Sequence, residues 1–451
     1  MERFSFATLC AIRAVVLASA IWCEGCGGEK EPPPPPPTGG GSGAFGVVTV
    51  NGLQKLYLPL PVSPAGKSNN QLAVVDVGVA GAGIAGSPAL LGYVDLGSAS
   101  DVATTTGGTS KIVVAASTSS PKVWLIDPTT DQVTSTIVLD DSYGTSSFSG
   151  GGGYVTGIAM DGDDRAILSV WNGFAILDIR TKAITSIAAA PSENFGFDPV
   201  RRRIIAPFYD CVGASGAGTA PPCDSYHTAT GAPIDEGLNV IDLNDTPPTV
   251  YTYQLPGAAS PLIPEAPVGG EPDSAAIDHD LGVAVIPSES ADFHNVIDLG
   301  AAVFDKAAGT VTGSAASHHE VAYTGRSEGV SIDSVSHLAF FEGESSSDVG
   351  VMDLVQAKAG AGMFLHATMP DKPHDGGSWS NLFDPHGIAV TTGILDGSPV
   401  GFVVDVSVSD QAWVARIDLK KFLAVRPALP GDASAAEIAG AVTFLDASTA
   451  R

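Results

Sequence analysis

Short apolar runs, several of them alternating with polar residues, recur along the chain and are separated by turn-forming residues. Runs of this length are typical of β-strands rather than amphipathic helices. Seven of them end directly in an aspartate: "LAVVD" at Asp76, "VWLID" at Asp127, "FAILD" at Asp178, "LNVID" at Asp242, "AAVFD" at Asp305, "VGVMD" at Asp353 and "VARID" at Asp418. Their spacing indicates a repeated unit of about fifty residues that carries insertions. We expect each aspartate to accept backbone N–H hydrogen bonds in the turn that follows it.

Each unit holds two further apolar runs ahead of its aspartate. The first follows a small or polar residue, as in "GIAMD" ending at Asp161 or "FGFD" ending at Asp198, and the second is of the kind "RAILSV" or "HLAFFEG". With the strand after the aspartate, each unit has four antiparallel strands, A to D, joined by hairpin turns. Four-stranded units arranged radially form a β-propeller. We therefore predict an all-β fold over residues 45–451, a β-propeller of seven four-stranded blades, although six or eight blades would also close a ring.

Two strings carry a resemblance to a known family. "PHGIAV" and "VWLIDPTTDQV" resemble the YVTN and lactonase-like propeller repeats of secreted bacterial proteins, over roughly residues 45–425. The resemblance implies the propeller fold and, as one function, lactonase-like chemistry. Either "FGVVTV" near the start or "AVTFLD" near the end is expected to supply the strand that joins the first and last blades.

Residues 1–26 are expected to be an export signal, because the apolar stretch "FATLCAIRAVVLASAIW" follows Arg3. Two processing routes fit: a small-residue cleavage site at Ala18 to Ala20, or a lipobox-like "CEGCGG" in which Cys26 would be lipidated. Residues 27–44 include "EKEPPPPPPTGGGSG", a stiff polyproline stretch followed by a flexible hinge, which is the composition of a spacer. We predict an exported protein, either an outer-membrane or cell-surface lipoprotein or a periplasmic or extracellular protein, with membrane contact only through a lipid anchor.

The formal net charge is −27, with 22 Lys and Arg in total. This balance argues against a nucleic-acid partner, which requires clustered basic side chains, and is compatible with cation binding. Cys211 and Cys223 are the two cysteines outside the signal region, and in an oxidising compartment we expect a disulfide that closes the loop between them. Sequence signatures of phosphate loops, serine-hydrolase elbows and zinc proteases are absent.

The long insertions are expected in the B–C and D–A connections, while the A–B and C–D turns stay short. In a propeller these two sets of connections lie on opposite faces. Examples are the Cys211 to Cys223 loop and the stretch "GMFLHATMPDKPHDGGSWSNLFDPHG". Insertions confined to one face mark the binding face of a repeat array. We therefore expect a monomer whose inserted face binds a protein, a small molecule or a glycan.

The residue just before each inner strand is polar wherever the units align. The column reads Ser100, Thr156, Glu193, Asp273, Glu328 and His386. Because inner strands surround the channel, we expect these side chains to converge at its mouth on the inserted face. Three carboxylates and a histidine would repel or become protonated without a cation. The candidate ligands of Ca²⁺ or another divalent cation are therefore Glu193, Asp273, Glu328 and His386, and a solvated polar channel is the alternative.

Eight of the nine histidines lie between residues 279 and 386. We expect His318, His319 and Glu320 in the D–A loop that enters the sixth blade, and His366, His374 and Asp375 in the loop that enters the seventh, on the same face as the ring. The histidine pair alone is typical of an ordinary loop.

Two functions remain open at this stage. The first is a binding or scaffold module whose inserted face is held outward by the spacer. The alternative is a metal-dependent lactonase-like hydrolase or lyase, in which the cation polarises a carbonyl and His386 is the catalytic general base or acid. The fold alone does not distinguish them.

Overall fold

The computed structural model describes residues 46–50, 53–59, 70–79, 88–97, 99, 101–104, 112–115, 122–139, 155–170, 173–190, 192, 194–208, 237–254, 272, 274–288, 291–307, 310–312, 318–322, 327, 329–343, 347–362, 364–371, 385–395, 398–408, 411–425 and 431–446. The chain divides into two units, Met1–Pro36 and Pro37–Arg451. All described residues belong to the second unit. None of the helices they form is long and apolar enough to cross a membrane.

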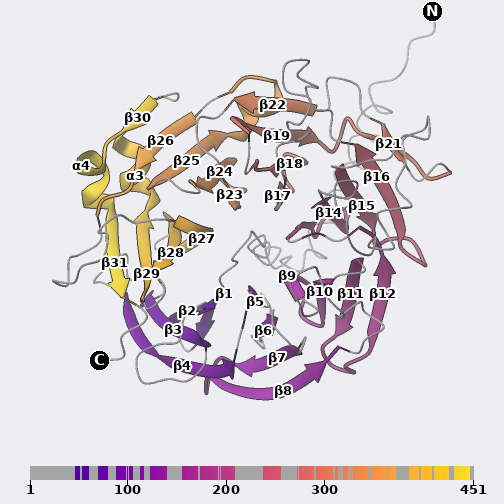
Figure 1. Cartoon of the computed structure of the whole chain (residues 1–451), viewed down its shortest axis with the longest axis horizontal. Coiled ribbons are helices and arrows are strands. Elements are labelled where there is room, and N and C mark those ends of the chain that lie inside the picture. The colour runs from indigo at the N-terminus through magenta and orange to yellow at the C-terminus, as the bar shows by residue number, and fades with distance from the viewer. Residues whose placement is uncertain are drawn as a thin grey trace, which may run out of the picture. The chain divides into compact units, whose positions relative to one another are not determined.

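The described strands form seven sheets, each built on four antiparallel strands that pair in chain order, and the fourth and sixth sheets carry added strands as well (Figure 1). In chain order the sheets contain β1 (Gly46–Val50), β2 (Leu53–Pro59), β3 (Asn70–Val79) and β4 (Ala89–Gly97); β5 (Asp101–Thr104), β6 (Ile112–Ala115), β7 (Lys122–Asp127) and β8 (Gln132–Val138); β9 (Val155–Asp161), β10 (Arg165–Val170), β11 (Gly173–Asp178) and β12 (Ile184–Ala188); β13 (Gly196–Asp198), β14 (Arg203–Phe208), β15 (Gly237–Asp242) and β16 (Thr249–Gln254); β17 (Ala276–Asp278), β18 (Val283–Ile286), β19 (Phe293–Asp298) and β22 (His318–Ala322); β23 (Val330–Asp333), β24 (Leu338–Glu342), β25 (Asp348–Asp353) and β26 (Phe364–Thr368); and β27 (Pro385–Leu395), β28 (Ser398–Val408), β29 (Gln411–Asp418) and β31 (Val442–Asp446).

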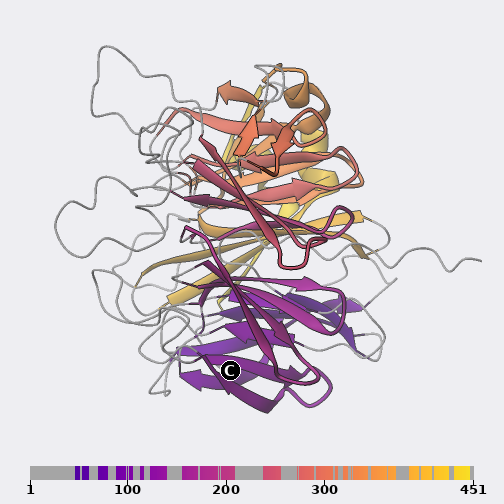
Figure 2. The ribbon, with the colours of Figure 1, turned by 90° about the vertical axis from the view of Figure 1, so that its right-hand side faces the viewer.

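The sheets are arranged around a ring with their first strands innermost, and in side view their strands run between the two faces (Figures 1 and 2). Neighbouring inner strands contact one another, as β5 does with β9, β13 with β17 and β17 with β23. The prediction of an all-β propeller arrangement is confirmed.

Apolar side chains fill the interfaces between successive sheets. Val285, Val296 and Phe341 belong to a buried cluster that joins the fifth and sixth sheets, and Val351 and Ile388 belong to one that joins the sixth and seventh. Strands covered on both faces read as near-continuous apolar runs, which is why alternation is weak in much of the sequence. Each such side chain contributes about 1.5–3 kcal/mol when fully buried.

Five of the seven repeated aspartates cap turns at the ends of third strands, as predicted, whereas Asp76 lies inside β3 and not at its end. Turn N–H groups are accepted, at 2.6 to 3.1 Å, by the carboxylates of Asp127, Asp178, Asp242, Asp353 and Asp418. In the fifth unit the prediction chose the wrong aspartate. The third strand, β19, ends at Asp298, whose Oδ1 accepts the N–H of Gly300 at 2.9 Å. Asp305 instead ends β20 (Val303–Asp305), in a separate hairpin with β21 (Thr310–Thr312).

The expectation that every C–D turn is short is wrong for three sheets. The fifth has the β20–β21 hairpin between its last two strands, and the sixth has the helix α2 (Leu354–Lys358). The seventh has α3 (Leu419–Val425), β30 (Gly431–Ala433), α4 (Ala435–Ile438) and the 3₁₀ helix η3 (Ala439–Ala441). Each insertion reaches the preceding sheet: β21 pairs with β16, α2 contacts β19 and β22, and β30 pairs with β26. Insertions are therefore not confined to one face, because these ones cover outer strands from the C–D side.

Neither predicted closing strand crosses between sheets. β1 is the innermost strand of the first sheet, and β31 is the outer strand of the last. The two sheets approach each other through side chains: burial, and then the negative charge of Asp446 in β31, raise the pKa of Tyr93 in β4. The first and last sheets each draw all their strands from their own stretch of sequence.

Charged side chains in the A–B turns link neighbouring sheets. Arg202, before β14, donates two hydrogen bonds to the carboxylate of Asp161 at the end of β9, at 3.1 and 2.9 Å. His337 Nδ1 lies 2.8 Å from Oδ2 of the fully buried Asp278. Both Arg202 and His337 have left-handed backbone conformations, with φ of 54° and 56°. The same turn geometry thus presents a side chain to the preceding sheet in both places.

A buried ionic contact joins the first two sheets. Lys55 Nζ in β2 lies 2.7 Å from Oδ2 of Asp131, in the β7–β8 turn, and donates to the carbonyl of Pro128 at 2.9 Å. The hydroxyl of Tyr57 donates to the other oxygen of Asp131. Burial, and then this hydrogen bond, raise the pKa of Tyr57. The phenol of Tyr57 therefore stays protonated and donates to Asp131, whose side chain is 28% exposed, whereas that of Lys55 is 8% exposed.

Candidate functional site

The ring predicted from the sequence lies mostly outside the described residues. This applies to Ser100, Glu193, Asp273 and Glu328, to the side chains of Thr156 and His386, and to His374, Asp375, Cys26, Cys211 and Cys223. The backbone of His386 lies in β27. The residues that flank the predicted ring positions are nevertheless described, because they lie at the starts of the inner strands.

Two of the predicted carboxylates directly follow a serine that makes the same local hydrogen bond. Ser192 Oγ donates to the carbonyl of Asn194 at 2.6 Å, and Ser327 Oγ donates to the carbonyl of Gly329 at 2.9 Å. Both serines are buried. The chain segments that contain Glu193 and Glu328 therefore share one backbone arrangement on their flanks, which supports their alignment as equivalent positions.

Both serines are also bonded to the end of the second strand of the preceding sheet. Ser169 Oγ, in β10, donates to the carbonyl of Ser192 at 2.5 Å. The N–H of Ser327 donates to the carbonyl of Ser288, just beyond β18, at 3.0 Å. These cross-sheet bonds fix the serine at the start of each of these two inner strands against the preceding sheet.

Buried polar groups continue around this end of the ring. The buried polar residues at the starts of inner strands are Asp101, Ser192, Asn194, Ser274 and Ser327, which we call the polar belt. Asp101 accepts the N–H of Val102 in its own strand and that of Ile158 in the next sheet, both at 2.7 Å. Hydroxyl, carbonyl and carboxylate oxygens of this kind are ligands that suit Ca²⁺.

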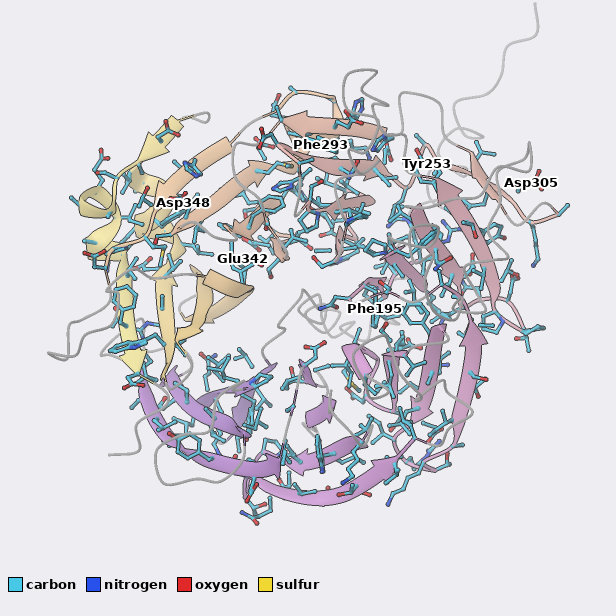
Figure 3. The ribbon with its side chains drawn as sticks, viewed as in Figure 1. Phe195, Tyr253, Phe293, Asp305, Glu342 and Asp348 are labelled. Carbon is cyan, nitrogen blue, oxygen red and sulfur yellow. The ribbon has the colours of Figure 1, made fainter. Side chains whose placement is uncertain are left out.

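Glu342 is a carboxylate that the predicted ring does not include. It ends β24, has 0% exposure and lies on the side of the sixth sheet that faces the interior of the ring (Figure 3). β24 contacts β27, the strand of His386. Burying a carboxylate without compensation is costly. The position of Glu342 at the end of the apolar run "HLAFF" is therefore the sequence feature that could have identified it as a candidate site residue.

His294 is buried between the fifth and sixth sheets. Its Nδ1 accepts the N–H of Ser288 at 3.1 Å, and its ring stacks on Phe341 with centroids 4.3 Å apart. Burial lowers the pKa of His294 to about 3. The imidazole is therefore neutral near pH 7 and positions Ser288, which in turn holds Ser327 of the polar belt.

The remaining histidines singled out by sequence lie elsewhere than predicted. His318, His319 and Glu320 lie in β22, and His366 lies in β26, so all four belong to outer strands rather than to D–A loops. Taking Asp305 as the end of a third strand displaced the whole fifth unit and put β22 beyond the sheet. These residues do not join the ring.

Two of the outer-strand histidines, His318 and His366, have opposite electrostatic surroundings. Burial, and then the charge of His319, lower the pKa of His318 to about 4, and its Nε2 lies 2.9 Å from Oδ1 of Asn295. A hydrogen bond to Asp348 raises the pKa of His366. Both arrangements are structural, because each ring is held by a partner in its own sheet.

Within the described residues, no three His, Cys, Asp or Glu side chains are grouped closely enough to hold a metal ion. The four predicted ligands are outside that set. The described polar belt can supply hydroxyl, amide and carbonyl oxygens and the carboxylate of Asp101, which already accepts two backbone N–H groups, so further charged ligands would have to come from the predicted ring.

The fold and the belt of buried polar groups at one end of its inner strands define a β-propeller. No family model matches the sequence, and no curated protein matches it. The structure is similar to that of a hypothetical selenium-binding protein from Sulfolobus tokodaii, at 10% sequence identity and a TM-score of 0.52, over 91% of this chain and 92% of that chain. It is also similar to Kluyveromyces lactis Hsv2, at 8% identity and a TM-score of 0.43, over 84% of this chain and 93% of that chain. The first similarity supports the propeller fold alone, and the YVTN and lactonase-like resemblance stays a prediction.

Proposed function

We propose that this protein is an exported binding module that holds a divalent cation and a ligand at the end of its channel where the inner strands begin. The observation that carries the proposal is the repeated arrangement around Ser192 and Ser327, each buried, bonded across to the preceding sheet and directly followed by a glutamate. Rigid, cross-linked flanks of this kind are what preorganises a ligand set.

The charge balance supports a cation rather than an anion at this position. Glu193, Asp273 and Glu328 belong to the aligned column, and Glu342 adds a fully buried carboxylate beside the strand of His386. The chain as a whole has a net charge of −27. Carboxylates gathered in a site of low dielectric are stabilised by a divalent ion, and Ca²⁺ accepts such oxygen sets with flexible geometry.

The same proposal includes the blades, the spacer and the disulfide of the whole chain. The seven sheets would be seven blades of one closed ring, and the monomer would be held off a membrane by the spacer when Cys26 is lipidated. A Cys211 to Cys223 disulfide would stiffen the B–C loop of the fourth blade, beside the proposed ligand site. A protein, small-molecule or glycan ligand is expected there, and nucleic acid is not.

Metal binding is tested with purified protein prepared by refolding or by periplasmic expression. Wild type is expected to contain a stoichiometric cation and to gain about 2.7 kcal/mol of stability at a free Ca²⁺ concentration one hundred times its dissociation constant. The double variant Glu193→Gln/Glu328→Gln should lose both effects. Asp280→Asn, which removes a mostly exposed carboxylate in an A–B turn, should behave as wild type. Metal-free wild type whose thermal stability ignores Ca²⁺ and Zn²⁺ would disprove the cation site.

A hydrolase or lyase of the lactonase-like kind is the second candidate, because the buried Glu342 lies in a strand that contacts the strand of His386. In that case the cation would polarise a carbonyl and His386 would transfer a proton. Wild type should then turn over lactones or esters, and His386→Ala should reduce kcat/KM by about 10²–10⁴-fold with unchanged metal content. Absence of turnover across a lactone and ester panel by metal-loaded wild type rejects this candidate and leaves the binding function standing.

A further inference from the structure

Two outer strands of the ring are covered by an added parallel strand. β21, from the C–D connection of the fifth sheet, pairs in parallel with β16 of the fourth, and β30, from that of the seventh, pairs in parallel with β26 of the sixth (Figure 1). An outer strand otherwise presents a row of unpaired N–H and C=O groups. This chain thus covers outer strands with short extended segments supplied by the next C–D connection.

β12 is an outer strand for which no such segment is supplied. The connection that would reach it is the short turn 243–248 of the fourth sheet, and no strand in the described part of the chain pairs with the outer edge of β12. Its sequence, "ITSIA", has no charge and no proline, and it pairs with β11 in an unbroken register. By contrast, the pairing of β8 and that of β4 are interrupted by register shifts. Charges, prolines and bulges are the usual protection of an exposed edge, and β12 has none of them.

The direction of the free backbone groups of β12 follows from its ladder. The N–H of Asp178 donates to the carbonyl of Ala183 at 2.8 Å, which sets the alternation of the antiparallel pair. Ile184, Ser186 and Ala188 therefore direct their N–H and C=O groups away from β11. The side chain of Ser186 is exposed, whereas Ile187 is buried and anchors the strand. The edge is anchored by Ile187, and no strand of the described residues pairs with it.

The charge beside this edge indicates what would bind. In the covered fourth sheet, Asp245 of the C–D turn forms an ion pair with Lys306 of the covering hairpin at 2.6 Å. The corresponding turn before β12 instead contains Arg180 and Lys182, which are exposed and form no ion pair with any described residue. The C–D turn before β12 thus carries positive side chains where that of the fourth sheet carries a negative one. A segment that complements this charge is acidic.

We propose that the outer edge of β12 is a docking site for an extended acidic segment of a partner polypeptide, which adds to the sheet as a parallel strand. Its N-terminal end lies beside Arg180 and Lys182, and its backbone bonds to the outward N–H and C=O groups of Ile184, Ser186 and Ala188. Strand addition of this kind gives affinity through the main chain and selectivity through flanking contacts. The site is separate from the polar belt and does not depend on a cation.

The test uses the full chain and three fluorescein-labelled peptides in which Thr-Val-Thr-Val-Thr, extended from the β21 pattern, follows two Asp, two Ser or two Lys residues. Fluorescence anisotropy should show the Asp peptide binding about 5-fold more tightly than the Ser peptide at low salt, since two exposed ion pairs contribute modestly. The difference should shrink at high salt. Amide hydrogen exchange should slow at residues 184–188.

The controls separate strand addition from other binding. Ser186→Pro removes an outward N–H and should abolish binding, while Ser186→Ala, which keeps it, should bind as wild type. If Ser186→Pro does not fold, an Asp peptide with alternate amides N-methylated serves instead and should not bind. Binding that survives methylation, equal affinity for the Asp and Lys peptides, or no binding at about 1 mM peptide overturns the proposal. Concentration-dependent dimerisation that Ser186→Pro removes would overturn it in favour of a second copy of this chain.

Discussion

Replacing Asp131 with alanine is expected to lower the free energy of unfolding by about 3–5 kcal/mol. The side chain of Lys55 is 8% exposed, and Asp131 is the carboxylate that neutralises it, at 2.7 Å. Without Asp131, the ammonium is left in a low-dielectric site with one carbonyl partner, and the hydroxyl of Tyr57 loses its acceptor. Urea denaturation followed by intrinsic fluorescence measures the loss.

A matched pair of variants isolates the uncompensated charge as the cause. Asp292→Ala removes an exposed carboxylate and should change stability by at most about 0.5 kcal/mol. The double variant Lys55→Met/Asp131→Ala removes both charges and should be more stable than Asp131→Ala alone, because no charge then remains unpaired. If Asp131→Ala costs no more than Asp292→Ala, the contact between the first two sheets is not a stabilising one.

Lowering the pH is expected to reduce the free energy of unfolding, and His294 is expected to contribute to this loss at a higher pH than most other titratable groups. Its pKa is about 3 in the folded state against about 6.5 unfolded, so below pH 6.5 the unfolded chain binds the extra proton. The contribution of neutral His294 is therefore fully present above pH 6.5 and falls as the pH is lowered toward 3, by about 4 kcal/mol in total. Unfolding free energies measured by denaturant titration between pH 7 and pH 4 test this slope.

His294→Asn provides the comparison, because its side-chain oxygen can still accept the N–H of Ser288 while it cannot become protonated. The variant should be less stable than wild type at pH 7, since the stack on Phe341 is lost, and its stability should fall less steeply with acid. Equal slopes for the two proteins would mean that the buried imidazole does not control acid stability.

The propeller arrangement was predictable because it follows from local chemistry repeated many times. An apolar run that ends in a turn-capping aspartate identifies a strand end wherever it occurs, and Asp127, Asp178 and Asp353 behave as expected. The period then limits the fold to a radial array. Nothing about distant pairing had to be known.

The fifth unit shows where local patterns stop being sufficient. "VFD" at Asp305 and "VID" at Asp298 both fit the strand-end pattern, and the polar His294 and Asn295 made the true strand the weaker match. Both of those side chains are buried only because neighbouring strands supply partners: Ser288 for His294 and His318 for Asn295. Which apolar run joins which sheet depends on these tertiary contacts, so the sequence pattern alone could not decide it.

The candidate site could likewise be predicted only in part from the sequence. The column that contains Glu193, Asp273, Glu328 and His386 was found by alignment of repeats, whereas the bonds that hold its flanks were not. The contact between Ser169 and Ser192 joins two sheets, and single-strand patterns contain no information about side chains across an interface. Glu342 was visible as a charge at the end of an apolar run, but its burial depends on the next sheet.

The first and last sheets of this ring share no strand, and that has a consequence for how the chain folds. A propeller that closes with a strand from each terminus cannot complete one of its sheets until both ends of the chain are present. Here the four antiparallel strands of each sheet pair in chain order, so each hairpin can form as soon as its sequence is available. Folding that begins at the N-terminus during synthesis can therefore complete the four antiparallel strands of each sheet in turn, which limits the time that the edges of its inner strands are exposed.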